Sequence, residues 1–128
     1  MVRRIPFLVV LVLVLAACGG DEAVSSRRDP AAVAAGAELF QANCAECHGV
    51  DLTGTDTGPP LLHRYYAPNH HADEAFQRAV LVGVVAHHWD FGPMEPVDGL
   101  DRADVSLIIE YVRAEQEAAG IFEDPSIP

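Results

Sequence analysis

Residues 43–50, NCAECHGV, place two thiols and an imidazole within five positions, at Cys44, Cys47 and His48. Cys18 is the only other cysteine of the chain. A disulfide between Cys44 and Cys47 would close a very short loop and remove little entropy from the unfolded chain. A thioredoxin-like redox pair needs a β-α-β setting, which the surrounding sequence does not resemble. A structural zinc site needs four ligands, and the chain has no second cysteine pair.

The remaining interpretation of Cys-x-x-Cys-His is the attachment of a c-type haem. Cys44 and Cys47 are then expected to bind the porphyrin edge through two thioethers. The adjacent His48 is placed to ligate the iron from the same side. The close spacing of the three residues therefore fits one porphyrin edge and its metal.

The surrounding sequence resembles the class I c-type cytochromes with a single haem. Four blocks occur in family order: GAELFQANCAECHG at 36–49, GPPL at 58–61, FGPMEPV at 91–97 and LIIEYVRA at 107–114. The resemblance spans about residues 31–119. It implies an all-α, small cytochrome c fold with three main helices and long loops around one covalently bound haem. It also implies a one-electron carrier rather than an enzyme.

Met94 is the predicted second axial ligand of the iron. It lies in a Gly-Pro-Met turn that resembles the ligand loop of the family, and Met1 is the only other methionine. A thioether ligand favours ferrous iron and raises the reduction potential. A methionine that fills a gap in the core is the alternative. Histidines that could replace it as ligand are His63, His70, His71, His87 and His88.

The resemblance also assigns residues around the haem. It implies that the carbonyl of Pro59 accepts the ring N–H of His48, and that Leu61 packs on the haem. Trp89 could pack on the haem or donate to a propionate, with core packing as the alternative. Glu95 stands where related sequences often have proline, and its carboxylate could lower the potential.

The paired histidines suggest a second metal as an alternative. His70-His71 and His87-His88 could hold copper. Two adjacent histidines point in different directions, however, and one pair cannot form a site unaided. A haem or copper sensor module is therefore a minor alternative to an electron carrier.

Three helices are expected to position these residues. Asp29 and Pro30 are typical of an N-cap and a first helical residue. The predicted helices run from Ala31 to about Cys44, from about Ala72 to Val85, and from near Asp101 to a stop at Gly120. The resemblance places Gly36, Phe40 and Tyr111 where the first helix crosses the last. Val105, Ile108, Ile109 and Val112 form the apolar stripe of the last helix.

The first residues predict export and a lipid anchor. Arg3 and Arg4 precede an apolar run that is too short to span a bilayer as a mature helix. The run ends at Leu15-Ala16-Ala17-Cys18, which resembles a bacterial lipobox and implies acylation of Cys18. The alternatives are an ordinary cleaved signal, in which Cys18 has no role, and an uncut signal anchor. The expected organisation is 1–17 lipoprotein signal peptide, 18–30 lipid-anchored flexible tether, 31–120 cytochrome c domain and 121–128 C-terminal tail.

The chain is acidic, with a formal net charge of −11 that becomes −13 when the two arginines of the signal are removed. Such a surface argues against nucleic-acid binding and suits partners with a basic docking face. We expect redox partners such as a membrane oxidase, a cytochrome bc complex or another reductase. The expected location is the outer face of the cytoplasmic membrane, or the periplasm. A haem-bearing subunit of a larger oxidoreductase is the alternative.

Overall fold

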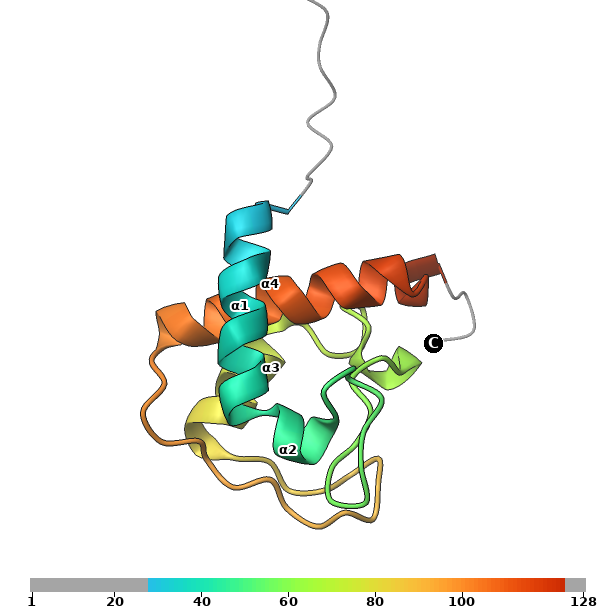
Figure 1. The fold of residues 1–128 in the computed structure, drawn as a ribbon. Helices are drawn as coiled ribbons and strands as arrows, with labels where there is room; N and C mark the ends of the chain where they lie inside the picture. The colour runs from blue at the N-terminus through green and yellow to red at the C-terminus, as the bar shows by residue number, and fades with distance from the viewer. Residues whose placement is uncertain (1–27, 124–128) are drawn as a thin grey trace, which may run out of the picture.

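The computed structural model describes residues 28–123, so the predicted signal, Cys18 and the last five residues lie outside the described part. The elements are α1 (Pro30–Asn43), α2 (Ala45–His48), the 3-10 helix η1 (Arg64–Tyr66), α3 (Asp73–Val82), α4 (Arg102–Ala118) and the 3-10 helix η2 (Ile121–Glu123). Long loops join them (Figure 1). Between residues 28 and 123, the single β pairing is an isolated bridge of Val84 with Met94. The predicted all-α fold is confirmed.

Helix α1 begins as the sequence predicts, with a small shift. The Asp29 side chain accepts from the Ala31 N–H at 3.0 Å. Pro30 occupies the first turn, where a backbone N–H would have no partner within the helix, so its missing N–H costs no hydrogen bond. Arg28, which belongs to the predicted tether, forms an ion pair with Glu110 of α4 at 2.9 Å. The start of α1 is therefore attached to the last helix.

Helix α4 has a reciprocal cap at its first turn. The Asp101 carboxylate accepts from the N–H groups of Ala103 and Asp104, at 2.7 and 3.0 Å. The Asp104 carboxylate in turn accepts from the Asp101 N–H at 3.1 Å. Asp104 therefore supports the start of the helix by a direct hydrogen bond as well as through the helix dipole.

Helices α1 and α4 cross with their main chains in contact (Figure 1). A Cβ atom at Gly36 would lie 1.9 Å from the carbonyl oxygen of Leu107, so glycine is required at this position. Phe40 is fully buried at the crossing, and its ring centroid lies 5.4 Å from that of Tyr111. The predicted crossing residues are thus confirmed, and all four members of the apolar stripe are buried.

Helix α3 is shorter than predicted. It runs from Asp73 to Val82 instead of reaching Val85. Gly83 has a φ of +81°, which ends the helix, and Val84 then exchanges two backbone hydrogen bonds of 2.9 Å with Met94. The apolar sequence after Val82 suggested a longer helix, but a pairing with a segment ten residues away determines the backbone there.

Two buried polar residues of α4 were not predicted. Arg113 is 1% exposed and Gln116 is fully buried. The Arg113 guanidinium donates to the carbonyls of Tyr66 and His71 and to the carboxylate of Asp73. Gln116 accepts from Arg113 at 2.7 Å and donates to the Tyr66 carbonyl at 3.1 Å. These contacts fasten the loop between η1 and α3 to the last helix.

Candidate haem site

A mainly apolar cavity of about 750 Å³ lies between the helices and the loops. Its size falls in the range usual for sites that bury a small organic ligand, about 300–1,000 Å³. Its walls come from all four α-helices and from the loops on either side of α3. Predicted site residues that line it are Cys44, His48, Pro59, Leu61, Trp89 and Met94.

His48 ends helix α2, and its ring is fixed by a backbone carbonyl. Its Nδ1 lies 2.9 Å from the carbonyl oxygen of Pro59, which can only accept, so Nδ1 carries the proton. Nε2 is left with the lone pair that a metal requires. Burial lowers the pKa of His48, with the Pro59 hydrogen bond acting in the opposite direction. The ring–carbonyl contact that the resemblance implied is present.

The loop that carries Pro59 passes close to helix α2. A Cβ atom at Gly58 would lie 2.6 Å from the carbonyl oxygen of Cys47. Thr55 also donates its hydroxyl to that oxygen at 2.6 Å. The close approach of the loop to α2 explains why a glycine precedes Pro59.

Neither cysteine of the motif forms a disulfide. Cys44 is half-buried and lines the cavity, whereas Cys47 is exposed and lies outside the lining. The amide of His48 donates to the Cys44 carbonyl at 2.9 Å, which holds the motif in one helical turn. Burial, together with the adjacent Cys47, raises the pKa of the Cys44 thiol to about 11.

Met94 reaches the same cavity from the segment after α3. Its backbone is fixed by the two hydrogen bonds with Val84, and its side chain packs against the buried cluster of Val80, Val105 and Ile109. It therefore contacts the core and also borders the cavity. The structure brings it to the cavity that His48 lines, as the predicted pair of ligands requires.

Several features of the cavity walls fit a large apolar plate with polar edges. Leu61 is 7% exposed at the wall. Val82, Val85 and Phe91 also line the cavity and are exposed. Within the described part of the chain, the buried Nε1 of Trp89 makes no hydrogen bond of good geometry, although the Tyr66 hydroxyl lies near it. A haem would cover the apolar side chains, and a propionate would supply an acceptor for Trp89.

The remaining histidines divide into two groups. His71, His87 and His88 border the cavity, whereas His63 and His70 do not. His70, His71 and His88 come together, with one ring nitrogen of each within 4.8 Å of the others. One pair alone could not make a site, but the fold combines members of both pairs. Their separation by 18 residues gives no signal of this in the sequence.

Between residues 28 and 123, no helix is both long enough and sufficiently apolar to cross a bilayer.

A helical fold around an apolar cavity, with Cys-x-x-Cys-His at one wall and a methionine at another, defines a c-type haem protein. The family model for cytochrome c matches residues 33–115, and the chain therefore belongs to the cytochrome c family. Members of this family bind haem c covalently and transfer electrons; this chain is a member with one haem.

One similar protein is cytochrome c-551 of Bacillus subtilis (strain 168). It is 41% identical over an alignment of 56 residues, and the match covers 40% of this chain and 49% of the relative. The chain thus matches about half the length of this curated relative. No solved structure gave a significant match.

Proposed function

We propose that this chain is a membrane-anchored, single-haem electron carrier of an extracytoplasmic electron-transfer chain. Cys44 and Cys47 would hold the haem through thioethers, and His48 and Met94 would ligate its iron. The haem supplies a one-electron iron couple. The protein supplies the ligands, their orientation and the exclusion of water around them.

The observation that carries this proposal is the shared cavity of His48, Met94 and Cys44. The Pro59 carbonyl holds the His48 ring so that Nε2 is available, and the bridge to Val84 fixes the backbone of Met94. Hydrogen bonds therefore hold the ring of His48 and the main chain at Met94 in place. An iron with two strong protein ligands leaves no open position for a substrate, which favours electron transfer over catalysis.

The residues around the ligands would tune the potential. The Nε1 of Trp89, which makes no hydrogen bond of good geometry within the described residues, could donate to a haem propionate. The Glu95 carboxylate is exposed and borders the cavity. A negative charge there stabilises ferric iron, so Glu95→Gln is expected to raise the midpoint potential, more at low salt than at high salt.

The axial ligand is tested by near-infrared absorbance and potentiometry of the haem-loaded protein. The wild type should show the ferric methionine–iron band, and Met94→Ala should lose it and acquire an open position that binds carbon monoxide in the ferrous state. Met94→His should keep six coordination and lower the potential. His87→Ala is the matched control and should keep the band. A wild type without the band would refute ligation by Met94.

The bis-histidine arrangement is the alternative that an observation favours, because His87 and His88 also border the cavity. It predicts the opposite pattern of effects. Replacing one of these histidines would then change the ferric spectrum, whereas Met94→Ala would leave it intact. The same set of variants therefore distinguishes the two arrangements.

The covalent attachment is tested independently of the axial ligand. Acidified acetone should leave the haem on the wild-type chain, and it should extract haem from a Cys44→Ala, Cys47→Ala variant if any is bound. Extraction from the wild type would refute the thioethers.

Anchoring through an acylated Cys18 rests on the resemblance of residues 15–18 to a lipobox. Two or more acyl chains give stable membrane attachment, and a tether then keeps the haem near membrane complexes at a high effective concentration. The wild type should fractionate with membranes, and Cys18→Ala should be released or retained as unprocessed precursor. Mass spectrometry of the mature N-terminus would detect the lipid, and an unmodified Cys18 would refute the anchor.

The partners we propose are a membrane oxidase, a cytochrome bc complex or another reductase. The net charge of −11 favours a basic docking surface on the partner. Electron transfer with the true partner should therefore become slower as ionic strength rises.

A further inference from the structure

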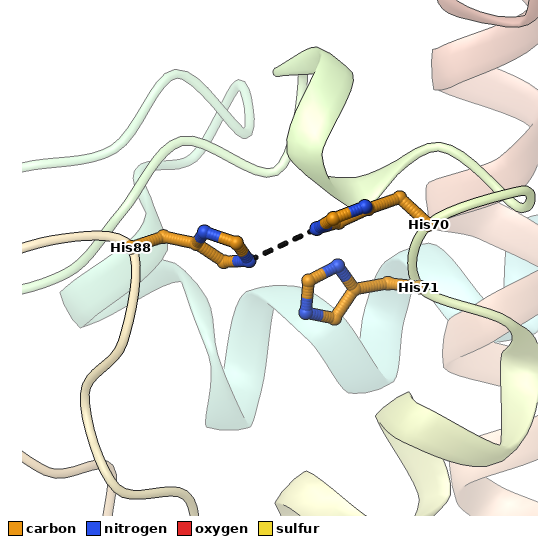
Figure 2. A group of neighbouring side chains, drawn as sticks. All are labelled: His70, His71 and His88. Carbon is orange, nitrogen blue, oxygen red and sulfur yellow. Dashed lines mark hydrogen bonds between the residues drawn. The ribbon is translucent and has the colours of Figure 1, made fainter. Parts of the chain in front are cut away.

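Three histidines from two separate loops meet at the rim of the haem cavity. His70 and His71 follow η1, and His88 lies in the loop after α3. Figure 2 shows the rings of these residues grouped between the two loops, with a hydrogen bond joining His70 to His88. One ring nitrogen of each residue lies within 4.8 Å of those of the other two.

The distance between two of the rings already suits a shared ion. The Nε2 atoms of His70 and His88 are 3.2 Å apart. Two imidazole nitrogens bound to a tetrahedral zinc ion at the usual bond length are about 3.3 Å apart. These two rings therefore have the separation that a common metal ion requires, and the third ring is close enough to join them.

Contacts outside the cluster hold the rings in place. The Nδ1 of His71 donates to the Tyr65 carbonyl, so its Nε2 carries the lone pair available to a metal. The backbone of His71 is attached to α4 because its carbonyl accepts from Arg113. The ring of His88 stacks on that of Tyr65, with centroids 4.5 Å apart and planes 22° apart. Rings held in advance lose little freedom when they bind an ion.

We propose that His70, His71 and His88 bind one divalent transition-metal ion of the zinc or copper(II) type, separate from the haem iron. Imidazole is a donor that both ions accept readily. Three protein ligands leave a fourth tetrahedral position for water or another donor. The nearest further imidazole is that of His87, whose ring centroid lies 4.4 Å from that of His88.

A bound ion would join the segment after η1 to the loop that leads to Met94. His71 and His88 line the haem cavity, so the ion would place positive charge at its rim. Positive charge stabilises ferrous iron relative to ferric iron, and the midpoint potential of the haem should therefore rise when the site is filled. The site would let the metal content of the surroundings adjust the electron carrier.

The test is a titration of the chelator-treated, haem-loaded protein with Zn²⁺, which is redox-inert and so leaves the haem oxidation state unchanged. Isothermal titration calorimetry should show one ion per chain, and the midpoint potential should shift upward at saturation. His70→Ala and His88→Ala should each weaken binding at least tenfold. His63→Gln is the matched control, because His63 packs on Trp89 but lies outside the cluster, and should bind Zn²⁺ like the wild type.

His70 is exposed, so its replacement should leave the fold intact, as circular dichroism would verify. No Zn²⁺ binding by the wild type, or equal binding by the wild type and the His70 and His88 variants, would overturn the proposal. The ferric spectrum of His88→Ala separates this proposal from the axial-ligand assignment. An unchanged spectrum leaves His88 free for the second metal, whereas a changed one assigns it to the haem iron and overturns the site.

Discussion

Gly36 offers the sharpest test of how the two long helices are held together. A Cβ atom there would lie 1.9 Å from the carbonyl oxygen of Leu107 and 2.6 Å from its carbonyl carbon. An ordinary van der Waals contact between the Cβ and this oxygen needs a distance about 1.5 Å longer, and the obstructing atoms belong to the backbone of α4. Gly36→Ala must therefore move one helix away from the other, because no side chain can rotate to make room.

Two opposing effects set the size of the change. Alanine is a better helix former than glycine by about 1 kcal/mol in a helix interior. Overpacking costs about 1–3 kcal/mol, and here it also separates Phe40 from Tyr111, whose rings are 5.4 Å apart. The contact is short enough to place the cost at the upper end of that range. We expect Gly36→Ala to lower the free energy of unfolding by about 2 kcal/mol.

The measurement is denaturant unfolding of the haem-loaded protein, followed by circular dichroism and by haem absorbance. Ala34→Gly is the matched control, because Ala34 is an exposed position of the same helix. It should lose about 1 kcal/mol through helix propensity alone. A Gly36→Ala variant that is as stable as the wild type, or more stable, would refute the close crossing of the helices.

Three further substitutions test other parts of the fold. Arg113→Ala leaves the His71 carbonyl without its donor and the Tyr66 carbonyl with Gln116 alone, and it should lower the free energy of unfolding by at least about 3 kcal/mol. Asp73→Asn should cost less than about 1 kcal/mol, because that carboxylate is 64% exposed. Equal effects of the two substitutions in chemical denaturation would contradict this ranking. Asp101→Ala removes the cap of α4 and should lower stability by about 0.5–2 kcal/mol, with no change in the haem spectrum as the check that the effect is local. Gly83→Ala is strained at a φ of +81° and would bring a Cβ within 2.7 Å of the Met94 carbonyl oxygen, so it should lower the free energy of unfolding by about 1–3 kcal/mol and weaken the methionine–iron band. A band of full intensity would show that the segment tolerates the substitution.

The parts of the fold that the sequence predicted correctly depend on local signals. The start of α1 follows from Asp29 and Pro30, and the start of α4 from Asp101, since caps act within a few residues. The contact of His48 with Pro59 was implied by a resemblance of sequence blocks and is present at 2.9 Å. The Cys-x-x-Cys-His motif is likewise a local pattern.

The features that were missed depend on contacts between distant segments. Helix α3 ends early because Val84 pairs with Met94, and the sequence of residues 82–85 does not indicate this pairing. The grouping of His70 with His88 requires two loops to meet across 18 residues. Sequence spacing cannot predict such meetings, because loop paths are set by the packing of the whole chain.

Arg113 and Gln116 are a different case, because the sequence does contain a signal for them. With Ile109 and Val112 they complete an i, i+3, i+4, i+7 pattern, so they continue the buried face of α4. Polar residues on such a face need partners, and long loops leave backbone carbonyls that need donors. The buried side chains satisfy the loop carbonyls, since both Arg113 and Gln116 donate to the carbonyl of Tyr66. In a small helical protein with long loops, donors on the buried face of a helix thus indicate where the loops are attached.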